Sequence, residues 1–544
     1  MKILLKNMIK LLILLVGLGL QVSCENPIVD LPNGQIRGRQ VSAPAVENFK
    51  YYAFLGIPYA APPVGKLRFQ APQPHSNWTG VFEATDNSKI CIQVGLKHAH
   101  ASEDCLYLNV YSPELSPSQK LPVLVFIHGG TFRRGSAFAG YKAPAFLVKE
   151  GIIVVTINYR LGPFGFLTSQ DNAMPGNYGL KDQHFALKWV QQNIHLFGGD
   201  PDQVTISGQS AGAASVAFHI MNLKSEGLFR AAIAHSGSAL NNWAYQHNGR
   251  DIAYGIAAEI DSNFTRDRTT DELLEFLTNV PASDIEKTAD KFSAFAPAIE
   301  VPNDDSVFAN LIYDAATLKY FNKVPLLIGI NSEEAVFKAK DLHSLKKEAA
   351  GVDKDPSKLV TFEVLPYNDS MQSLVGNKIK NLYVEEQTFE ENLGKYLQYF
   401  GDNRYMRPVI KFAELISTAA SVYFYQFSYS GKLGGNDVSY PGIGKVAHGE
   451  DLNYLWVYHD DYTSFPDSDL VTLKRYVQIV ANFVKNLEPS ISDETINWPL
   501  VQSGSISYLD IDEKLSIKKN PREFSYSKWE DIFSNYARTP YLSY

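Results

Sequence analysis

Cysteine is scarce in this chain, which has three among 544 residues. Cys24 lies at the end of an N-terminal export segment described below, so two cysteines remain, Cys91 and Cys105. A zinc site would need more ligands than these two residues offer, and we expect no metal site. In an oxidising compartment the pair would form a disulfide that closes the loop of residues 92–104. Closing a loop of this size stabilises a fold by roughly 3 kcal/mol.

Positive charge is also in short supply. The 50 lysines and arginines are outnumbered by 58 aspartates and glutamates, which leaves a formal net charge of −8. The chain has no basic stripe that would attract nucleic acid or anionic lipid. We therefore expect no nucleic-acid partner.

Long hydrophobic runs are missing except near the N-terminus. There, Leu11–Leu20 follows a lysine-bearing segment, and Val22 and Cys24 stand at the −3 and −1 positions of a cleavage point. The run is too short to span a membrane, and its flanks are typical of a secretory signal peptide, residues 1–24. The last residues, Ala537–Tyr544, contain neither a hydrophobic anchor tail nor a retrieval signal. We expect a secreted, extracellular protein without a stable membrane anchor.

Because we expect export, three Asn-X-Ser/Thr sequons, at Asn77, Asn263 and Asn368, are candidate glycosylation sites. Each is an acceptor for N-linked glycan in a secreted protein. Short motifs of this kind also arise by chance, so the sequence leaves open which of the three are used.

Continuous apolar runs mark the interior segments of the chain. Runs without alternation indicate parallel strands covered on both faces, and helical spacing of apolar residues appears elsewhere. The strand-like runs are Leu121–Ile127, Ile152–Ile157, Ala231–Ala234 and Pro325–Ile330, and the helical ones include Phe185–Ile194 and Leu470–Leu487. These patterns predict an α/β fold with a large, mostly parallel central sheet covered by helices on both faces.

Ser210 lies at the centre of the pentapeptide GQSAG, residues 208–212. A strand-like run, Val204–Ser207, precedes it, and a helix-like run, Ala213–Ile220, follows it. A G-x-S-x-G turn between strand and helix is a nucleophile elbow, whose glycines permit a sharp bend that lifts the serine hydroxyl above the sheet. The pentapeptide alone is often only a turn, but these flanks favour a catalytic serine.

A serine nucleophile needs donors for the oxyanion and a base for its proton. The first strand-like run is followed by Gly129 and Gly130, whose backbone N–H groups would form an oxyanion hole with that of Ala211. His128, which precedes the glycines, is an alternative base. Serine hydrolases built on such a sheet place the acid and then the histidine after the serine, so a structural role is favoured for His128.

The acid and the base are therefore sought beyond Ser210. The last strand-like run leads into Asn-Ser-Glu-Glu, which puts Glu333 and Glu334 at the sheet edge where the other groups lie. The histidines that follow are His343 in a lysine-rich stretch, His448 after a glycine-rich loop, and His459. A defined loop suits a catalytic imidazole, and we expect His448 to be the base.

Four longer motifs make the chain similar to a known family. They are FGGDPDQVTISGQSAG (197–212), EDCLYLNVY (103–111), GNYGLKDQ (176–183) and GIPYAAPPVGKLRF (56–69). On these motifs the chain resembles the type-B carboxylesterase and cholinesterase family of α/β-hydrolases, most closely its secreted insect esterases. The resemblance runs from Pro27 to at least Trp456.

The resemblance assigns roles to the residues that match the family's pattern. It implies Ser210 as nucleophile, His448 as general base and acid, Glu334 rather than Glu333 as the orienting acid, and Gly129, Gly130 and Ala211 as the oxyanion hole. The same comparison implies that two charge pairs, Arg68 with Glu103 and Arg160 with Asp182, are buried structural ion pairs. Because one site draws on residues from four distant regions, most of the chain must close around one sheet. We expect residues 25–544 to form a single domain.

The expected activity is hydrolysis of a small uncharged carboxylic ester through an acyl-enzyme, without a cofactor. A glutamine before the serine, as at Gln209, resembles the elbow of juvenile hormone esterases. Odorant- and pheromone-degrading insect esterases also carry glutamine at this position, so these alternatives stay open. A cholinesterase is less favoured because residues 92–104 lack the tryptophan that a quaternary ammonium group would need. A catalytically inactive adhesion protein is less favoured because every triad residue is present. The sequence leaves the physiological ester, the tissue and the oligomeric state open.

Overall fold

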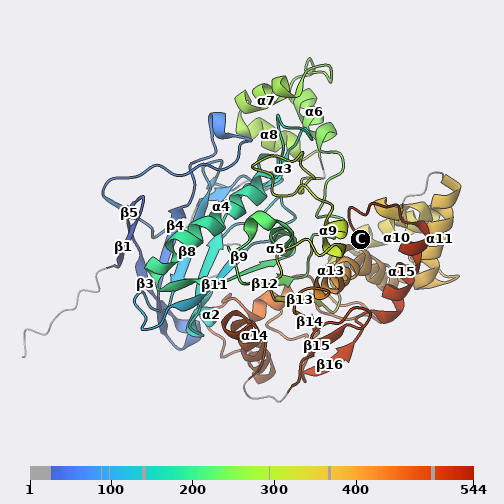
Figure 1. The fold of residues 1–544 in the computed structure, drawn as a ribbon. Coiled ribbons are helices and arrows are strands. Elements are labelled where there is room, and N and C mark those ends of the chain that lie inside the picture. Colours follow the sequence, from blue (N-terminus) through green and yellow to red (C-terminus); the bar gives the residue numbers. More distant parts are fainter. Residues whose placement is uncertain are drawn as a thin grey trace, which may run out of the picture.

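The computed structural model of the protein describes residues 26–86, 89–96, 98–137, 143–292, 294–364, 369–491 and 496–544. The expected signal peptide, residues 1–24, and the sequon residue Asn368 lie outside the described residues. The described part contains one large sheet, two small sheets and helices on both faces of the large sheet (Figure 1).

An eleven-stranded sheet forms the centre of the molecule, in the order β16-β15-β14-β13-β12-β11-β9-β10-β8-β4-β3. In chain order, the strands are β3 (Arg39–Ala43), β4 (Phe49–Pro58), β8 (Tyr107–Ser112), β9 (Leu121–Ile127), β10 (Ile153–Ile157), β11 (Gly199–Gln209), β12 (Ala231–His235), β13 (Leu326–Asn331), β14 (Val422–Phe427), β15 (Ser507–Ile511) and β16 (Ser516–Lys519). The small sheets contain β1 (Ile28–Leu31), β2 (Gly34–Arg37) and β5 (Val81–Glu83), and β6 (Ile90–Cys91) with β7 (Ala101–Ser102).

The middle of the large sheet is parallel, as the continuous apolar runs predicted. Every pairing from β10 through β9, β11, β12, β13 and β14 to β15 is parallel. The edges differ, because β8, β4 and β3 pair antiparallel on one side and β16 does so on the other. The apolar runs did not predict these antiparallel strands. The sheet as a whole therefore combines a parallel centre with antiparallel strands on both sides.

Alternate side chains of the central strands face two separate hydrophobic clusters. On one face, Val123 and Val125 of β9 belong to the same cluster as α4 (Tyr178–Asn193), α5 (Ala211–Met221) and α13 (Arg407–Ser417). On the other face, Leu124 and Phe126 join the cluster of α2 (Ala145–Lys149) and α14 (Asp467–Asn486). The prediction of helices on both faces of the sheet is confirmed.

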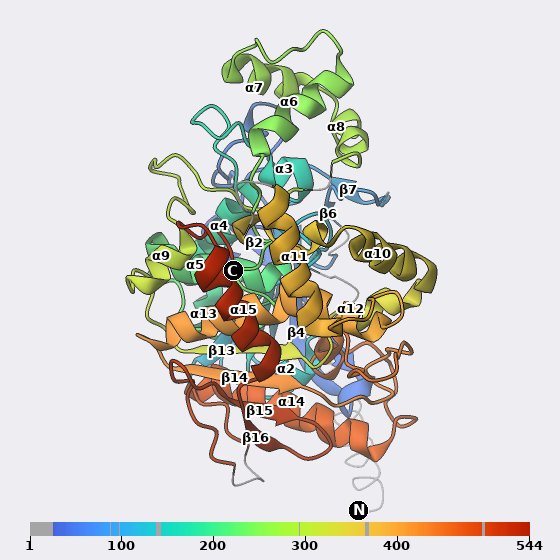
Figure 2. The same ribbon diagram turned by 90° about the vertical axis from the view of Figure 1, so that its right-hand side faces the viewer.

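The remaining helices extend the structure away from the sheet. In Figures 1 and 2, α6, α7 and α8 gather at the top, and α10, α11, α12 and α15 lie together on one side. Their bounds are α3 (Gly162–Phe166), α6 (Gly249–Ile260), α7 (Thr270–Asn279), α8 (Ala282–Ala289), α9 (Ile312–Thr317), α10 (Leu342–Lys354), α11 (Asp369–Val384), α12 (Leu393–Gly401) and α15 (Glu523–Tyr536). No helix among the described residues is long and apolar enough to cross a membrane.

The sheet brings three distant segments of the chain to one edge. β9 ends at Ile127, β11 at Gln209 and β13 at Asn331, and all three strands point the same way. In open α/β sheets the carboxyl ends of the strands are where ligands bind. A ligand site is therefore expected among the loops that follow these three strands.

Candidate active site

Ser210 occupies a strained turn between β11 and α5. Its backbone angles are φ 58° and ψ −120°, a conformation that non-glycine residues rarely adopt. The turn is crowded, since a Cβ atom added at Gly212 would lie 2.0 Å from the carbonyl oxygen of Ile127. This close approach explains why position 212 is a glycine. The Ser210 side chain is nearly buried, with 6% of the residue exposed.

The glycine loop after β9 lies directly against this elbow. A Cβ atom added at Gly129 would fall 2.5 Å from the carbonyl oxygen of Gln209 and 3.0 Å from the Ser210 Cβ atom. Gly130 has a φ of 111°, and its carbonyl oxygen accepts hydrogen bonds from the backbone N–H groups of Arg133 and Arg134. The loop is thus folded back on itself beside the serine.

Ala211 is the first residue of α5, so its backbone N–H has no acceptor within the helix. The N-terminus of a helix also carries a partial positive charge that favours an anion nearby. Together with the neighbouring glycine loop, this places backbone donors of two separate segments close to the Ser210 side chain.

His448 and Glu334 are in direct contact. The Nδ1 atom of the histidine lies 2.7 Å from Oε2 of the glutamate, and the backbone N–H of His448 donates to the Glu334 carbonyl at 3.2 Å. The second carboxylate oxygen of Glu334 accepts from the backbone N–H of Asn331 at 2.7 Å. Glu334 is fully buried, whereas the His448 side chain remains 15% exposed. The imidazole therefore has one edge fixed by a buried carboxylate and another open toward solvent.

Glu333 points away from this histidine. Its Oε1 atom is 2.5 Å from the Arg522 guanidinium, and its Oε2 atom accepts from the backbone N–H of Gly444 at 3.0 Å. Burial raises the pKa of Glu333, an effect that the nearby Arg522 opposes. The two adjacent glutamates thus occupy different environments, and the structure brings only Glu334 to the imidazole.

The far nitrogen of the His448 ring faces the elbow. The Nε2 atom of Gln209 lies 3.1 Å from Nε2 of the imidazole, so the amide donates to the ring when that nitrogen is unprotonated. Among the described residues this amide, rather than the Ser210 hydroxyl, makes the hydrogen bond to the ring nitrogen. Hydrogen bonds of catalytic groups are often loose without substrate and tighten when it binds.

His128, the alternative base, is buried beneath the glycine loop. Its Nδ1 atom is 2.8 Å from the Gly129 carbonyl oxygen, and its ring stacks on Tyr159 with centroids 4.4 Å apart. Burial lowers the pKa of His128 to about 4, because the charged form would lose its hydration. His343 and His459 are exposed. These placements agree with a structural role for His128.

A buried polar network that sequence reasoning missed lies under the site. Asp451 accepts hydrogen bonds from Tyr476 at 2.9 Å and from the Asn331 side chain at 3.2 Å, and His235 lies 3.5 Å away. The same Asn331 side chain donates to the Ala447 carbonyl at 2.7 Å. Asp451 therefore fixes an asparagine that holds the backbone just before His448. The only signal in the sequence was its position three residues after that histidine.

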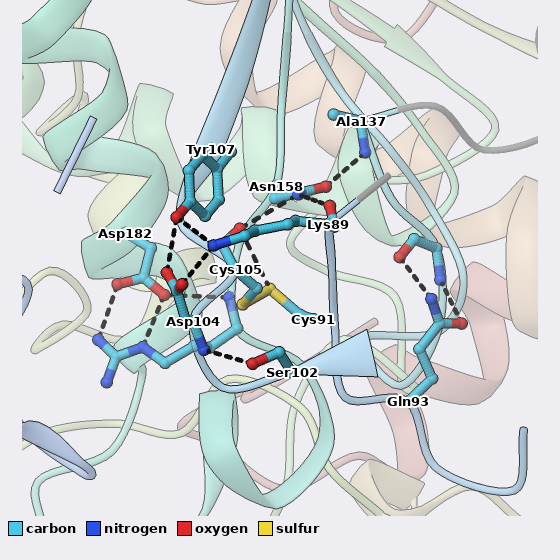
Figure 3. Close-up of a disulfide and its surroundings, with 12 residues drawn as sticks. Lys89, Cys91, Gln93, Ser102, Asp104, Cys105, Tyr107, Ala137, Asn158 and Asp182 are labelled. Atoms are coloured by element: carbon cyan, nitrogen blue, oxygen red, sulfur yellow. Dashed lines mark hydrogen bonds and ion pairs between the residues drawn. A yellow bond between two sulfur atoms is a disulfide. The ribbon is translucent and has the colours of Figure 1, made fainter. Parts of the chain in front are cut away.

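The two remaining cysteines form the predicted disulfide, with an S–S distance of 2.04 Å (Figure 3). Both charge pairs inferred from the family resemblance are also present. The Arg68 guanidinium lies 2.6 Å from Glu103, and that of Arg160 lies 2.7 Å from Asp182. Asp182 is fully buried, which fits a structural ion pair.

The two described sequon asparagines, Asn77 and Asn263, are exposed. Within the part of the chain that the structure covers, no group of three or more His, Cys, Asp or Glu side chains is arranged to hold a metal ion.

A mostly parallel central sheet, with a serine at a strained strand–helix turn and an acid–histidine pair at the same edge, is the architecture of the α/β-hydrolases. The motifs had implied this fold, and the described structure has it.

Comparisons with known proteins identify the family within the α/β-hydrolases. A model of the carboxylesterase family matches residues 25–529. The chain is 32% identical over 482 residues to a juvenile hormone esterase of Tribolium castaneum, which covers 82% of each protein. It is also 32% identical to esterase FE4 of Myzus persicae, with 90% of each covered. The crystal structure of juvenile hormone esterase from Manduca sexta, with OTFP covalently attached, matches with a TM-score of 0.82 at 28% identity, covering 94% of this chain and all of that one.

The chain therefore belongs to the carboxylesterase family, and it is a carboxylic-ester hydrolase. The family inferred from the sequence motifs is confirmed.

Proposed function

We propose that the protein is a secreted serine carboxylesterase that hydrolyses uncharged carboxylic esters through an acyl-enzyme intermediate. In this proposal Ser210 is the nucleophile, His448 the general base and acid, and Glu334 the carboxylate that orients the imidazole. The observation that carries it is the 2.7 Å contact between His448 Nδ1 and Glu334 Oε2, with the opposite ring nitrogen turned toward the elbow. A fixed imidazole beside a strained serine is what activation of a hydroxyl requires.

The reaction follows from this arrangement. Glu334 accepts a hydrogen bond from the Nδ1–H group of His448, which leaves Nε2 unprotonated and able to take the proton of the Ser210 hydroxyl once it exchanges Gln209 for the serine. The serine oxygen attacks the ester carbonyl, and His448 passes its proton to the alcohol as the carbon–oxygen bond breaks. A water molecule, deprotonated by the same histidine, then attacks the acyl-enzyme. As the bond between the acyl carbon and the Ser210 oxygen breaks, His448 returns the proton to that oxygen and the acid is released.

The tetrahedral intermediate needs donors for its oxyanion. We assign this role to the backbone N–H groups of Gly129, Gly130 and Ala211. Their support is the crowding of the glycine loop against the elbow and the position of Ala211 at the start of α5. Preorganised donors of this kind are commonly the largest single contribution to such catalysis.

Export completes the proposal. Residues 1–24 are removed as a signal peptide, residues 25–544 form the mature single domain, and Asn77, Asn263 and Asn368 are the glycan acceptors. The disulfide supports export, because such bonds persist mainly in oxidising compartments. The exposure of Asn77 and Asn263 supports their modification.

A juvenile hormone esterase is a second candidate. Gln209 in the elbow and the similarity to two proteins of that name favour it. An odorant- or pheromone-degrading esterase shares the same glutamine. A cholinesterase is disfavoured, since a quaternary ammonium group would be desolvated without the compensating tryptophan, a deficit of about 2 kcal/mol.

Two measurements test the proposal. Ser210→Ala should be secreted at the wild-type level yet lose about a millionfold in turnover, and an organophosphate should label only the wild type, at Ser210. Substantial esterase activity in a clean Ser210→Ala preparation would refute the mechanism.

A panel of aryl esters, an epoxide-bearing methyl ester like juvenile hormone, long-chain acetates and acetylcholine, ranked by kcat/KM, then decides the substrate class. Acetylcholine should rank at least about tenfold below the aryl esters, and parity would refute the uncharged-ester assignment.

A further inference from the structure

Gln93 connects the disulfide-closed loop to the glycine loop of the site. It stands two residues after Cys91 and is 7% exposed. Both polar atoms of its carboxamide bind the backbone of one residue, Gly135. The Nε2 group donates to the Gly135 carbonyl at 3.0 Å, and the Gly135 N–H donates to Oε1 at 3.1 Å (Figure 3).

Gly135 in turn packs against the backbone that carries the oxyanion donors. Its φ is 109°, and an added Cβ atom would lie 2.3 Å from His128 Nδ1 and 2.5 Å from the Gly129 carbonyl oxygen. Any shift of the Gly135 peptide toward the loop would therefore press on Gly129. A residue that fixes the position of Gly135 therefore also limits the position of Gly129.

The turn between these glycines is strained and needs external support. Thr131 and Phe132 both have positive φ angles, 57° and 58°. Backbone of this kind persists only where the surroundings hold it. The support comes largely from the disulfide-closed loop, where Val94 N–H donates to the Arg133 carbonyl at 3.1 Å and the Arg134 side chain donates to the Val94 carbonyl at 3.0 Å.

The other end of the turn is tied to the second cysteine. Asn158 accepts a hydrogen bond from the Ala137 N–H at 2.7 Å and donates to the Cys105 carbonyl at 3.1 Å. Gln93 and Val94 thus hold the middle of the segment 130–137, at residues 133–135, and Cys105 holds its end at Ala137 through Asn158. Among these contacts, Gln93 is the side chain that binds the backbone of Gly135, which lies next to Gly129.

We propose that Gln93 is a positioning residue for the oxyanion hole, acting through Gly135 on the Gly129–Gly130 backbone. This inference rests on the proposed serine mechanism. Gln93 touches no reacting atom in it. Its loss would leave substrate binding nearly unchanged and weaken stabilisation of the tetrahedral intermediate, because small displacements of preorganised donors reduce their contribution.

The first test replaces the carboxamide with an apolar group of similar shape. Gln93→Met should lower kcat by about 10- to 100-fold, less than the roughly 10²- to 10³-fold loss found when one oxyanion donor is removed outright, because the donors are displaced and not deleted. KM should change less than about twofold, and the Ki of an aryl trifluoromethyl ketone, which forms a tetrahedral adduct, should rise by the same factor as kcat falls.

The matched control is Gln191→Met. Gln191 in α4 also donates to two backbone carbonyls, those of Pro201 and Leu228, each at 2.9 Å. It should lose thermal stability without the selective loss of kcat. An unchanged kcat in Gln93→Met, or equal loss of kcat in both variants, would overturn the proposal.

A second variant keeps the test decisive if Gln93→Met folds poorly. Gln93→Glu retains the volume; protonated, its carboxyl can both donate to and accept from the Gly135 peptide, whereas ionised it repels the Gly135 carbonyl. The ratio of its kcat to the wild-type kcat should therefore rise as pH falls from 8 to 5, and a pH-independent ratio would contradict a positioning role.

Organophosphate titration of Ser210 in each preparation counts the working sites. Activity without labelling would mean that the proposed nucleophile is wrong. Full labelling with unaltered kcat in both Gln93 variants would mean that only the role of Gln93 is wrong.

Discussion

At the scale of single residues, the His448 ring is held on three sides. Glu334 binds Nδ1 at 2.7 Å, Gln209 contacts Nε2 at 3.1 Å, and the Tyr405 ring lies over the imidazole with centroids 4.4 Å apart. An imidazole fixed in this way loses little entropy when it transfers a proton. The contact with Gln209 also means that substrate binding must redirect one hydrogen bond at this ring.

The two adjacent glutamates give the sharpest prediction at this scale. Glu334→Gln should lower kcat by about 10⁴-fold, because the amide stabilises the wrong tautomer of His448 and cannot balance its positive charge. Glu333→Gln should leave kcat within a few fold and lower the thermal midpoint, since Arg522 loses one of its two carboxylate partners and keeps only Asp402. Steady-state kinetics and thermal melts of both variants provide the check. The opposite ranking of kcat would show that Glu333 orients the histidine.

At the scale of elements, the end of β13 and the loop that carries His448 are joined by backbone bonds. Glu333 N–H donates to the Val446 carbonyl at 3.0 Å, and His448 N–H donates to the Glu334 carbonyl at 3.2 Å. On the other side of the loop, the buried Glu450 accepts from the Ala447 N–H at 2.8 Å. The loop that carries His448 is thus held by a strand end and by a carboxyl group two residues after the histidine.

That carboxyl group predicts a pH dependence of stability. Burial, with a smaller contribution from Asp451, raises the pKa of Glu450 from its ordinary value of 4.5 to about 7. The folded protein therefore keeps a proton that the unfolded chain releases, and stability falls as pH rises from about 4.5 to about 7. The loss is on the order of 3 kcal/mol. Glu450→Gln, neutral at every pH, should show a flatter urea midpoint between pH 5 and 8, and an unchanged slope would contradict the assignment.

The sequence predicted some elements and not others for physical reasons. β9, β10, β12 and β13 lie between two helical layers, so both faces are apolar and the runs stand out. The strands at the two edges of the sheet, β3 and β16, have exposed residues that weaken any such pattern. Each pairs antiparallel with its neighbour in the chain, β3 with β4 and β16 with β15. An antiparallel edge strand can face water on one side, so it needs no continuous apolar run.

At the scale of the whole molecule, the sheet assembles a site from segments hundreds of residues apart. Ser210, Gly129, Gly130 and His448 could be predicted from local patterns, namely a tight elbow, a glycine loop and a histidine after a glycine-rich loop. The family resemblance then favours Glu334 over Glu333. The network around Asp451 could not be located, because His235, Asn331 and Tyr476 come from three different elements. Each is an ordinary residue in its own segment, and only the fold gives it a partner.

The buried pair of Arg160 and Asp182 ties this architecture together. Arg160 follows β10 and Asp182 lies in α4, and three hydrogen bonds of 2.7 to 3.0 Å join them. Removing one partner leaves a buried charge unpaired, which costs about 3 to 5 kcal/mol. Asp182→Asn should therefore lower the urea midpoint and the secreted yield sharply.

The chemistry should survive in the Asp182→Asn molecules that do fold, because neither residue of the pair touches the proposed triad. kcat per site, counted by organophosphate titration, should stay within about threefold of the wild type, well under the tenfold change that 1.4 kcal/mol in the barrier would produce. The exposed pair of Arg266 and Asp251 is the control, with side chains 67% and 57% exposed. Asp251→Asn should change neither the urea midpoint nor kcat, since exposed ion pairs contribute little. A large fall in kcat per titrated site in Asp182→Asn, with the urea midpoint intact, would show that the pair serves catalysis rather than folding.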